Sequence, residues 1–212
     1  PNDICAIGVT TQRSSIIVWD EATGTPITPM VVWSDQRGKQ RAQELTEQGF
    51  AVHFQHAAAK LEAVLTLAED RVSATTRWGN IDSFLIWKLS GEHITDHSQA
   101  WSCGYYDFGG TGWNEALINA QGLSISLFPG LVDTRGQVAE TSEKVFGAKV
   151  PITAIVADQQ CALVAHGDLT ASACKMTYGT SGVFNLSTGQ SLEMPDATIV
   201  PWIQSRIMDE TT

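Results

Sequence analysis

The chain has 212 residues and a net charge of −10 at neutral pH, with 43% hydrophobic and 17% charged residues. Such a composition is typical of a globular protein with a sizeable core, and it excludes a disordered, collagenous or coiled-coil chain. No segment is basic, so the sequence predicts that neither nucleic acid nor an anionic membrane surface is a partner.

Cysteine and histidine usage argues against a disulfide framework and against a metal site in this chain. The four cysteines form no Cys-x-x-Cys pair, and the five histidines are scattered. No apolar run reaches the roughly 18 residues that a membrane-spanning helix requires. We therefore expect a protein of the reduced cytoplasm.

The first part of the chain predicts strands joined by short turns. Apolar segments over residues 4–9, 15–19 and 29–33 each favour a strand, and the polar residues 20–26 with their late glycine favour a hairpin connection. Three strands in a row predict an antiparallel or mixed sheet.

The middle of the chain has helical periodicity. Helices are expected over residues 36–48, 57–72, 81–89 and 113–121, and a short strand near Gln137. In the third helix, Ile81, Leu85 and Leu89 share one face, which we expect to be the buried one. Gly79 or Asn80 is the expected cap of that helix.

The last third combines strand and helix patterns. The apolar run 152–157 predicts a strand that is covered on both faces of its sheet, and it leads directly into Asp158. A helix over 159–166 and strands over 171–178 and 183–187 are expected to follow, with a domain boundary at 167–171.

Asp158 is a candidate for chemistry because of its place at the carboxyl end of a strand and the beginning of a helix. Open α/β sheets put ligand-handling groups there. An ionised aspartate at this point can accept the proton of a hydroxyl whose oxygen attacks a phosphoryl group. The alternative is that Asp158 only caps the helix.

Two further features favour ligand binding. The turn Gly179-Thr180-Ser181-Gly182 offers backbone N–H groups and hydroxyls that suit phosphate oxygens without a cationic side chain, although it also fits an ordinary hairpin turn. Arg13 and Trp33 follow or end strands, so a planar donor and an aromatic wall can meet at one sugar pocket. Their alternatives are a surface charge for Arg13 and a core residue for Trp33.

Five segments taken together resemble the FGGY carbohydrate kinases, in the glycerol kinase-like branch. They keep the order of that family along the chain and cover nearly all of it up to residue 189. The segments are residues 6–13, 31–37, 80–91, 157–163 and 177–182.

This resemblance implies a carbohydrate kinase that uses ATP and Mg²⁺ to phosphorylate a hydroxyl of a sugar or polyol. It implies an α/β protein of ribonuclease H-like (actin-like ATPase) fold, with a mixed sheet flanked by helices and a cleft between two such domains. The matching positions are Asp158 as catalytic base, Arg13, Trp33 and Gln159 as sugar contacts, and Gly179, Thr180 and Gly182 at the transferred phosphate; no position in this chain matches a metal ligand.

The resemblance also implies a division of the chain. Residues 1–168 are expected to form the substrate-binding N-terminal domain without its first phosphate loop, and residues 169–212 the beginning of the C-terminal nucleotide-binding domain. We therefore expect a portion of a longer cytoplasmic kinase. Its oligomeric state is open, with a homodimer as one alternative.

Two departures from glycerol kinases bear on the substrate. Those enzymes follow Gln-Arg with a substrate-binding Glu, where this chain has Ser14, and their substrate-contacting Tyr is replaced by Gln55 or His56. A polyol or ketose other than glycerol is therefore expected. The departures also support an alternative function, a catalytically inactive sugar-sensing or interaction protein on the same fold. A third hypothesis is a bare α/β domain in which Asp158 and the turn have structural roles only.

Overall fold

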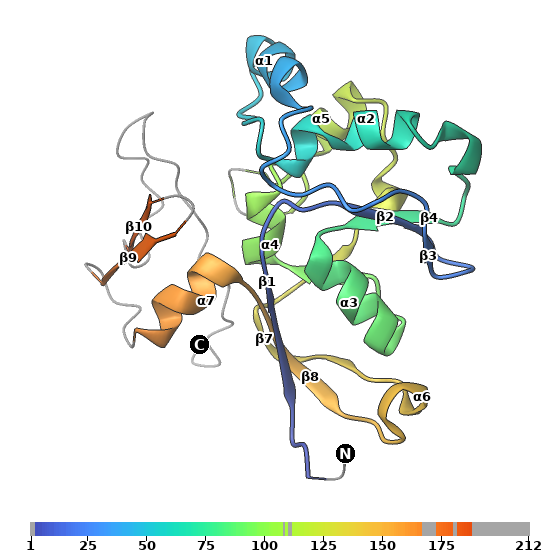
Figure 1. Cartoon of the computed structure of the whole chain (residues 1–212), viewed down its shortest axis with the longest axis vertical. Coiled ribbons are helices and arrows are strands. Elements are labelled where there is room, and N and C mark those ends of the chain that lie inside the picture. The colour runs from blue at the N-terminus through green and yellow to red at the C-terminus, as the bar shows by residue number, and fades with distance from the viewer. Residues whose placement is uncertain (1–2, 108, 110–111, 167–172, 180–181, 188–212) are drawn as a thin grey trace.

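A computed structural model describes residues 3–107, 109, 112–166, 173–179 and 182–187 (Figure 1). A sheet with strand order β1-β8-β7 runs through it, built from β1 (Ile7–Thr11), β8 (Pro151–Ala157) and β7 (Arg135–Glu140). The β1 strand is parallel to β8 and β7 is antiparallel to it. The predicted central strand over 152–157, the strand near Gln137 and the mixed sheet are thus confirmed.

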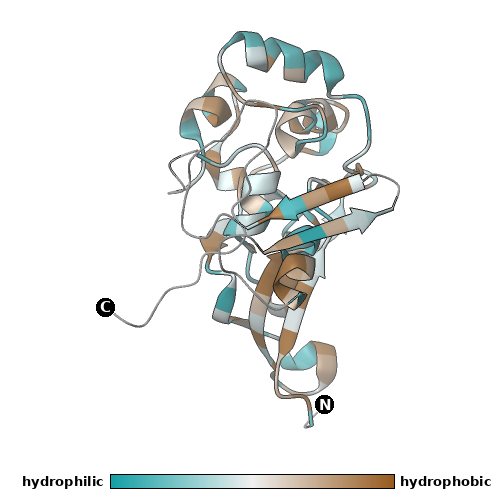
Figure 2. Ribbon diagram, turned by 90° about the vertical axis from the view of Figure 1, so that its left-hand side faces the viewer, coloured by the Kyte–Doolittle hydropathy of each residue, from teal (hydrophilic) through white to brown (hydrophobic). Residues whose placement is uncertain are grey.

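Ile152, Ile155 and Ala157 of β8 are buried and the other residues of the strand are half-buried, so the predicted cover on both faces of the sheet is only partly confirmed. The helix α3 (Ile81–Ser90) contacts the neighbouring strands β1 and β7. Ile152 and Ile155 of β8 form a core cluster with Val9 of β1 and Ile86 of α3. Figure 2 shows this concentration of apolar residues on the long strands. It also shows the polar character of the helix Lys39–Glu47, at the top of the view. The predicted first strand begins too early, since Ile4 precedes β1 and is 50% exposed.

A second sheet has the antiparallel order β3-β2-β4, from β3 (Thr25–Pro26), β2 (Ile17–Asp20) and β4 (Thr76–Gly79). The hairpin expected over 20–26 is confirmed. The single sheet expected from the first three strands is wrong, because β1 and β2 belong to different sheets. The strand expected over 29–33 is also wrong: only Val31 bridges to Ile16, and the backbone groups of Trp33 bond to the side chains of Ser15 and Lys60 instead.

A helical layer lies against this second sheet (Figure 1). It contains α1 (Lys39–Glu47), α2 (Leu61–Thr66) and α5 (Glu115–Ala120), with 3₁₀ turns at Ala57–Ala59, Glu69–Arg71 and Ile125–Leu127. The helices expected over 36–48 and 113–121 are confirmed. The single helix expected over 57–72 is wrong, because the chain changes direction at Lys60, whose φ is −120°, and places that side chain in the interior.

The helix α3 has the expected position, with Asn80 at its N-cap and Gly91 at its C-cap, but its buried face is not the predicted one. Leu85 is 41% exposed, whereas Asp82, Ser83 and Ile86 are buried. The reason is a polar contact, since Asp82 accepts a hydrogen bond from Thr95 at 2.6 Å. Apolar periodicity could not indicate that orientation.

The remaining elements complete the fold. They are β5 (Ile94–Asp96), which pairs in parallel with β6 (Gly130–Val132), then α4 (His97–Ser102), α6 (Glu143–Phe146), α7 (Asp158–Ala165), and the antiparallel pair β9 (Cys174–Tyr178) and β10 (Gly182–Leu186). The helix and two strands expected after residue 158 are confirmed, and the boundary at 167–171 lies outside the described residues. Within the described residues, every helix is too short or too polar to cross a bilayer.

Candidate active site at the carboxyl end of the central strand

Asp158 is the first residue of α7 and directly follows β8. The N-cap position belongs to Ala157, so Asp158 is not the cap that the alternative hypothesis required. Its Oδ1 atom accepts a hydrogen bond from the backbone N–H of Gln159 at 2.8 Å. The side chain is 43% exposed, so a ligand can reach the carboxylate.

Arg13 faces this carboxylate. Its Nε atom lies 3.5 Å from Oδ1 of Asp158, and its side chain is only 15% exposed. Burial lowers the pKa of Arg13 to about 10, and the nearby negative charge of Asp158 opposes that shift. The surface-charge alternative for Arg13 is therefore wrong, because a guanidinium is buried at this cost only where it has an opposite charge or hydrogen-bond partners.

Lys175 is a site residue that the sequence did not reveal. Its Nζ atom donates to Oε1 of Gln159 at 2.9 Å, and Thr177 donates to the same oxygen at 3.3 Å. The pKa of Lys175 is lowered, chiefly by burial and to a lesser extent by Arg13, while Asp158 raises it. The one signal in the sequence is its isolation, because Lys175 is the first lysine or arginine after Lys149.

Trp33 joins the site through its backbone. Its N–H donates to Oγ of Ser15 at 3.1 Å, and its carbonyl oxygen accepts from Lys60 at 3.1 Å. The residue is half-buried and lies outside both apolar core clusters of the described chain. The core alternative for Trp33 is therefore wrong, and contact of its ring with a ligand stays a prediction.

The glycine-rich turn connects β9 to β10. Gly179 follows the last residue of β9, and Gly182 begins β10 opposite Tyr178. Thr180 lies outside the described residues. The hairpin predicted as the alternative is present, and it carries Lys175 on the adjoining strand. A role for the turn in phosphate binding stays a prediction.

A buried hydrogen-bond chain fixes the end of β8. Ser98 accepts a hydrogen bond from the backbone N–H of Ala157 at 2.9 Å and donates to Asp96 at 2.9 Å. Asp96 also accepts from Thr134 at 2.7 Å and is fully buried. Burial raises the pKa of Asp96, and its hydrogen bonds oppose that shift. The residue before Asp158 is thereby held in one position.

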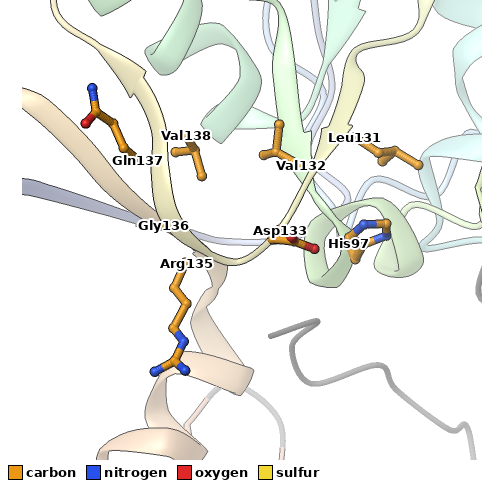
Figure 3. Close-up of a pocket in the computed structure, with 8 residues that line it drawn as sticks. All are labelled: His97, Leu131, Val132, Asp133, Arg135, Gly136, Gln137 and Val138. Carbon is orange, nitrogen blue, oxygen red and sulfur yellow. The ribbon is translucent and has the colours of Figure 1, made fainter. Parts of the chain in front are cut away.

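A pocket of about 420 Å³ lies beside these residues but does not include them (Figure 3). It is lined by His97 of α4 and by seven residues of β6, β7 and the turn between them. In Figure 3, Asp133 points toward His97, while Arg135 points away from both. Of the predicted site residues that the structure describes, none lines this pocket.

Comparison with known proteins gives consistent matches. The model of the FGGY family of carbohydrate kinases, N-terminal domain, matches residues 1–165. The chain is 30% identical to the glycerol kinase of Acinetobacter baylyi over 225 residues, which cover 99% of this chain and 46% of that protein. It is 32% identical to the glycerol kinase of Nostoc sp. over 204 residues, covering 91% and 41%.

A solved structure of a glycerol kinase also superposes on this chain. The crystal structure of Plasmodium falciparum glycerol kinase with ADP superposes with a TM-score of 0.77 at 25% identity, and covers 85% of this chain and 39% of that one. The predicted α/β class and actin-like ATPase fold are confirmed by this likeness. The chain spans less than half the length of the relatives described here.

Proposed function

The chain belongs to the FGGY family of carbohydrate kinases, and on that premise we propose that the protein transfers the γ-phosphate of ATP to a hydroxyl of a sugar or polyol. The observation that carries this proposal is the pairing of Arg13 with a solvent-accessible Asp158 at the carboxyl end of the central strand. A carboxylate in that place suits general-base chemistry on a hydroxyl.

Asp158 is the general base of the proposed reaction. The substrate O–H gives its proton to the carboxylate while its oxygen forms a bond to the γ-phosphorus. The bond from that phosphorus to the β,γ-bridging oxygen breaks, and ADP leaves. Both contacts made to Asp158 use Oδ1, so we assign the proton to Oδ2.

Three side chains position the acceptor in this proposal. Arg13 donates to substrate oxygens with its planar fork, Trp33 packs against C–H surfaces of the sugar, and Gln159 offers an amide whose orientation Lys175 sets. A polyol or ketose other than glycerol fits this site. Ser14 supports that choice, because its side chain is buried and donates to the backbone carbonyl of Ser102 rather than facing the substrate.

ATP is the proposed phosphate donor, with Gly179, Thr180 and Gly182 near the transferred group. The described residues bring no three His, Cys, Asp or Glu side chains together, so they supply no cage for Mg²⁺. We propose that this ion is held chiefly by nucleotide phosphates and water, and no step above depends on it. A cytoplasmic location is proposed because ATP and reduced thiols coexist there. The oligomeric state is either a monomer or a homodimer, and analytical ultracentrifugation distinguishes the two.

A coupled ADP-release assay on the full-length protein tests the proposal, with glycerol, other polyols, pentuloses and hexuloses as acceptors. One acceptor should support turnover, and Asp158→Asn should lower kcat by about 10²- to 10⁴-fold. The control is Asp133→Asn, on a carboxylate of the separate pocket, which should leave kcat unchanged.

Two results would overturn the proposal. Turnover of Asp158→Asn within a few-fold of wild type would remove the assigned base. Thermal stabilisation by a sugar without turnover of any acceptor would favour the sugar-sensing alternative.

A further inference from the structure

Lys60 is a fully buried cation with an unusual set of partners. Its Nζ atom donates to four backbone carbonyl oxygens, those of Gln55 at 3.0 Å, Trp33 at 3.1 Å, Val32 at 3.2 Å and Ser14 at 3.3 Å. An ammonium group has three N–H donors, so all three are engaged and at least one is shared between two of these oxygens. Burying a charge is costly without such compensation.

The four carbonyls belong to three separate loops. Ser14 follows Arg13 in the loop after β1, Val32 and Trp33 lie in the loop before α1, and Gln55 lies just before the 3₁₀ turn Ala57–Ala59. Two further links join the first two loops, since Ser15 accepts a hydrogen bond from the N–H of Trp33 and Ile16 forms a β-bridge with Val31. Lys60 thus bonds to the backbone carbonyl of Ser14, next to Arg13, and to that of Trp33. These are the two segments that carry proposed sugar contacts.

Resting on the proposed function, we propose that Lys60 is a positioning residue of the acceptor site, because its ammonium group fixes the loop of Arg13 relative to the loop of Trp33. The sugar or polyol then meets a site that is already formed. A misplacement of about 1 Å in such contacts can cost 10²-fold in rate. The nucleotide has no contact with these loops in the proposed arrangement, so the effect is specific to the acceptor.

The titration of Lys60 provides a second experimental readout of this inference, the dependence of the acceptor KM on pH. Burial lowers the pKa of Lys60 to about 8, Asp35 raises it and Arg37 lowers it. Asp35 is itself bound by Arg37 at 2.9 Å. The neighbouring His56 has its pKa lowered to about 4, chiefly by burial, so it stays neutral from pH 7 to 9. Above pH 8, therefore, Lys60 loses one N–H and its hold on the loops weakens.

Steady-state kinetics of the full-length protein test this inference with Lys60→Met and Lys60→Arg. Lys60→Met should raise KM for the acceptor about tenfold or more and change KM for ATP less than about twofold. In wild type, the acceptor KM should rise from pH 7 to 9. In Lys60→Arg it should stay flat, because a guanidinium remains charged throughout this range.

Lys88→Met is the matched control. Lys88 also donates to a backbone carbonyl, that of Gly24 at 2.6 Å, but it joins α3 to the turn between β2 and β3, which carries no proposed site residue. Its kinetic constants should equal those of wild type. An acceptor KM of Lys60→Met within twofold of wild type, or an equal rise in both KM values, would overturn the inference.

Two measurements keep the test independent of folding and of the proposed function. If Lys60→Met does not fold, Lys60→Gln takes its place, and an acceptor KM of that variant within twofold of wild type overturns the inference. If wild type shows no turnover, the proposed function fails, and hydrogen exchange of folded Lys60→Met decides instead. Faster exchange confined to residues 12–16 and 31–35 supports loop positioning by Lys60, and unchanged exchange there overturns it.

Discussion

The Nε atom of Arg13 lies 3.5 Å from Oδ1 of Asp158, although the two residues stand near opposite ends of the matched domain. Strand pairing brings them together. The parallel register places Thr11 of β1 opposite Ala157 of β8, so both strands end at the same edge of the sheet. Arg13 and Asp158 follow the two strand ends there. Parallel strands in α/β proteins put ligand-binding groups at this edge.

Replacing Arg13 with Gln should lower kcat/KM for the acceptor by about 10²-fold, because a planar charged donor is lost beside the general base. The measurement is the ADP-release assay with the acceptor varied at saturating ATP. Arg71→Gln serves as control, since Arg71 is exposed and pairs with the neighbouring Asp70 at 3.7 Å. A loss of less than threefold for Arg13→Gln would contradict its role.

Lys175→Met should raise the acceptor KM about tenfold, because Gln159 loses the partner that orients its amide. Thr177→Val removes the longer hydrogen bond to the same oxygen, at 3.3 Å, and should have a smaller effect. KM for the acceptor and KM for ATP are measured for both variants. Equal effects of the two substitutions would show that the charge of Lys175 is not important.

The position of Asp158 could be predicted from the sequence, because an apolar run ended at a carboxylate. Its pairing with Arg13 could not, since periodicity does not tell which strands are neighbours. The strand expected over 29–33 failed for a related reason. Its backbone groups bond to Ser15 and Lys60, and no local pattern indicates that a distant side chain will take them.

The two buried lysines could not be predicted from local sequence patterns either. A lysine in a helical or strand pattern is ordinarily assigned to solvent, yet Lys60 and Lys175 are both buried. Each is compensated by oxygen atoms from segments remote in the sequence. The buried Asp82 misled the prediction of α3 in the same way, because its partner Thr95 lies on another element.

Ser98→Ala should lower the free energy of unfolding by about 1–3 kcal/mol, because the buried N–H of Ala157 loses its acceptor. We also expect kcat to fall about tenfold, since Asp158 is the next residue. Urea unfolding and the ADP-release assay measure the two effects. Ser90→Ala is the control, because the hydrogen bonds of Ser90 stay at the end of α3: it donates to the carbonyl of Ile86 one turn earlier and accepts from the exposed N–H of Glu92.

The carboxyl group of Asp82 should make stability depend on pH. Burial raises its pKa to about 7 from the ordinary 3.8, the nearby Asp96 adds to that shift and the hydrogen bond from Thr95 opposes it. The stabilising contribution of protonated Asp82 is therefore complete below pH 3.8 and is lost as the pH rises to about 7. The contribution of Asp82 to the free energy of unfolding should fall from pH 5 to pH 8.

Asp82→Asn removes this titration and keeps an acceptor for Thr95, so its unfolding free energy relative to wild type should be higher at pH 8 than at pH 5. Urea unfolding at both pH values measures the difference. Asp20→Asn is the control, because the pKa of Asp20 is lowered, chiefly by the N–H of Thr23. The stabilising contribution of Asp20 is lost only in acid, so this variant should lose the same stability at pH 5 and pH 8. A difference between Asp82→Asn and wild type that does not change with pH would show that Asp82 is already ionised in the folded protein at pH 5.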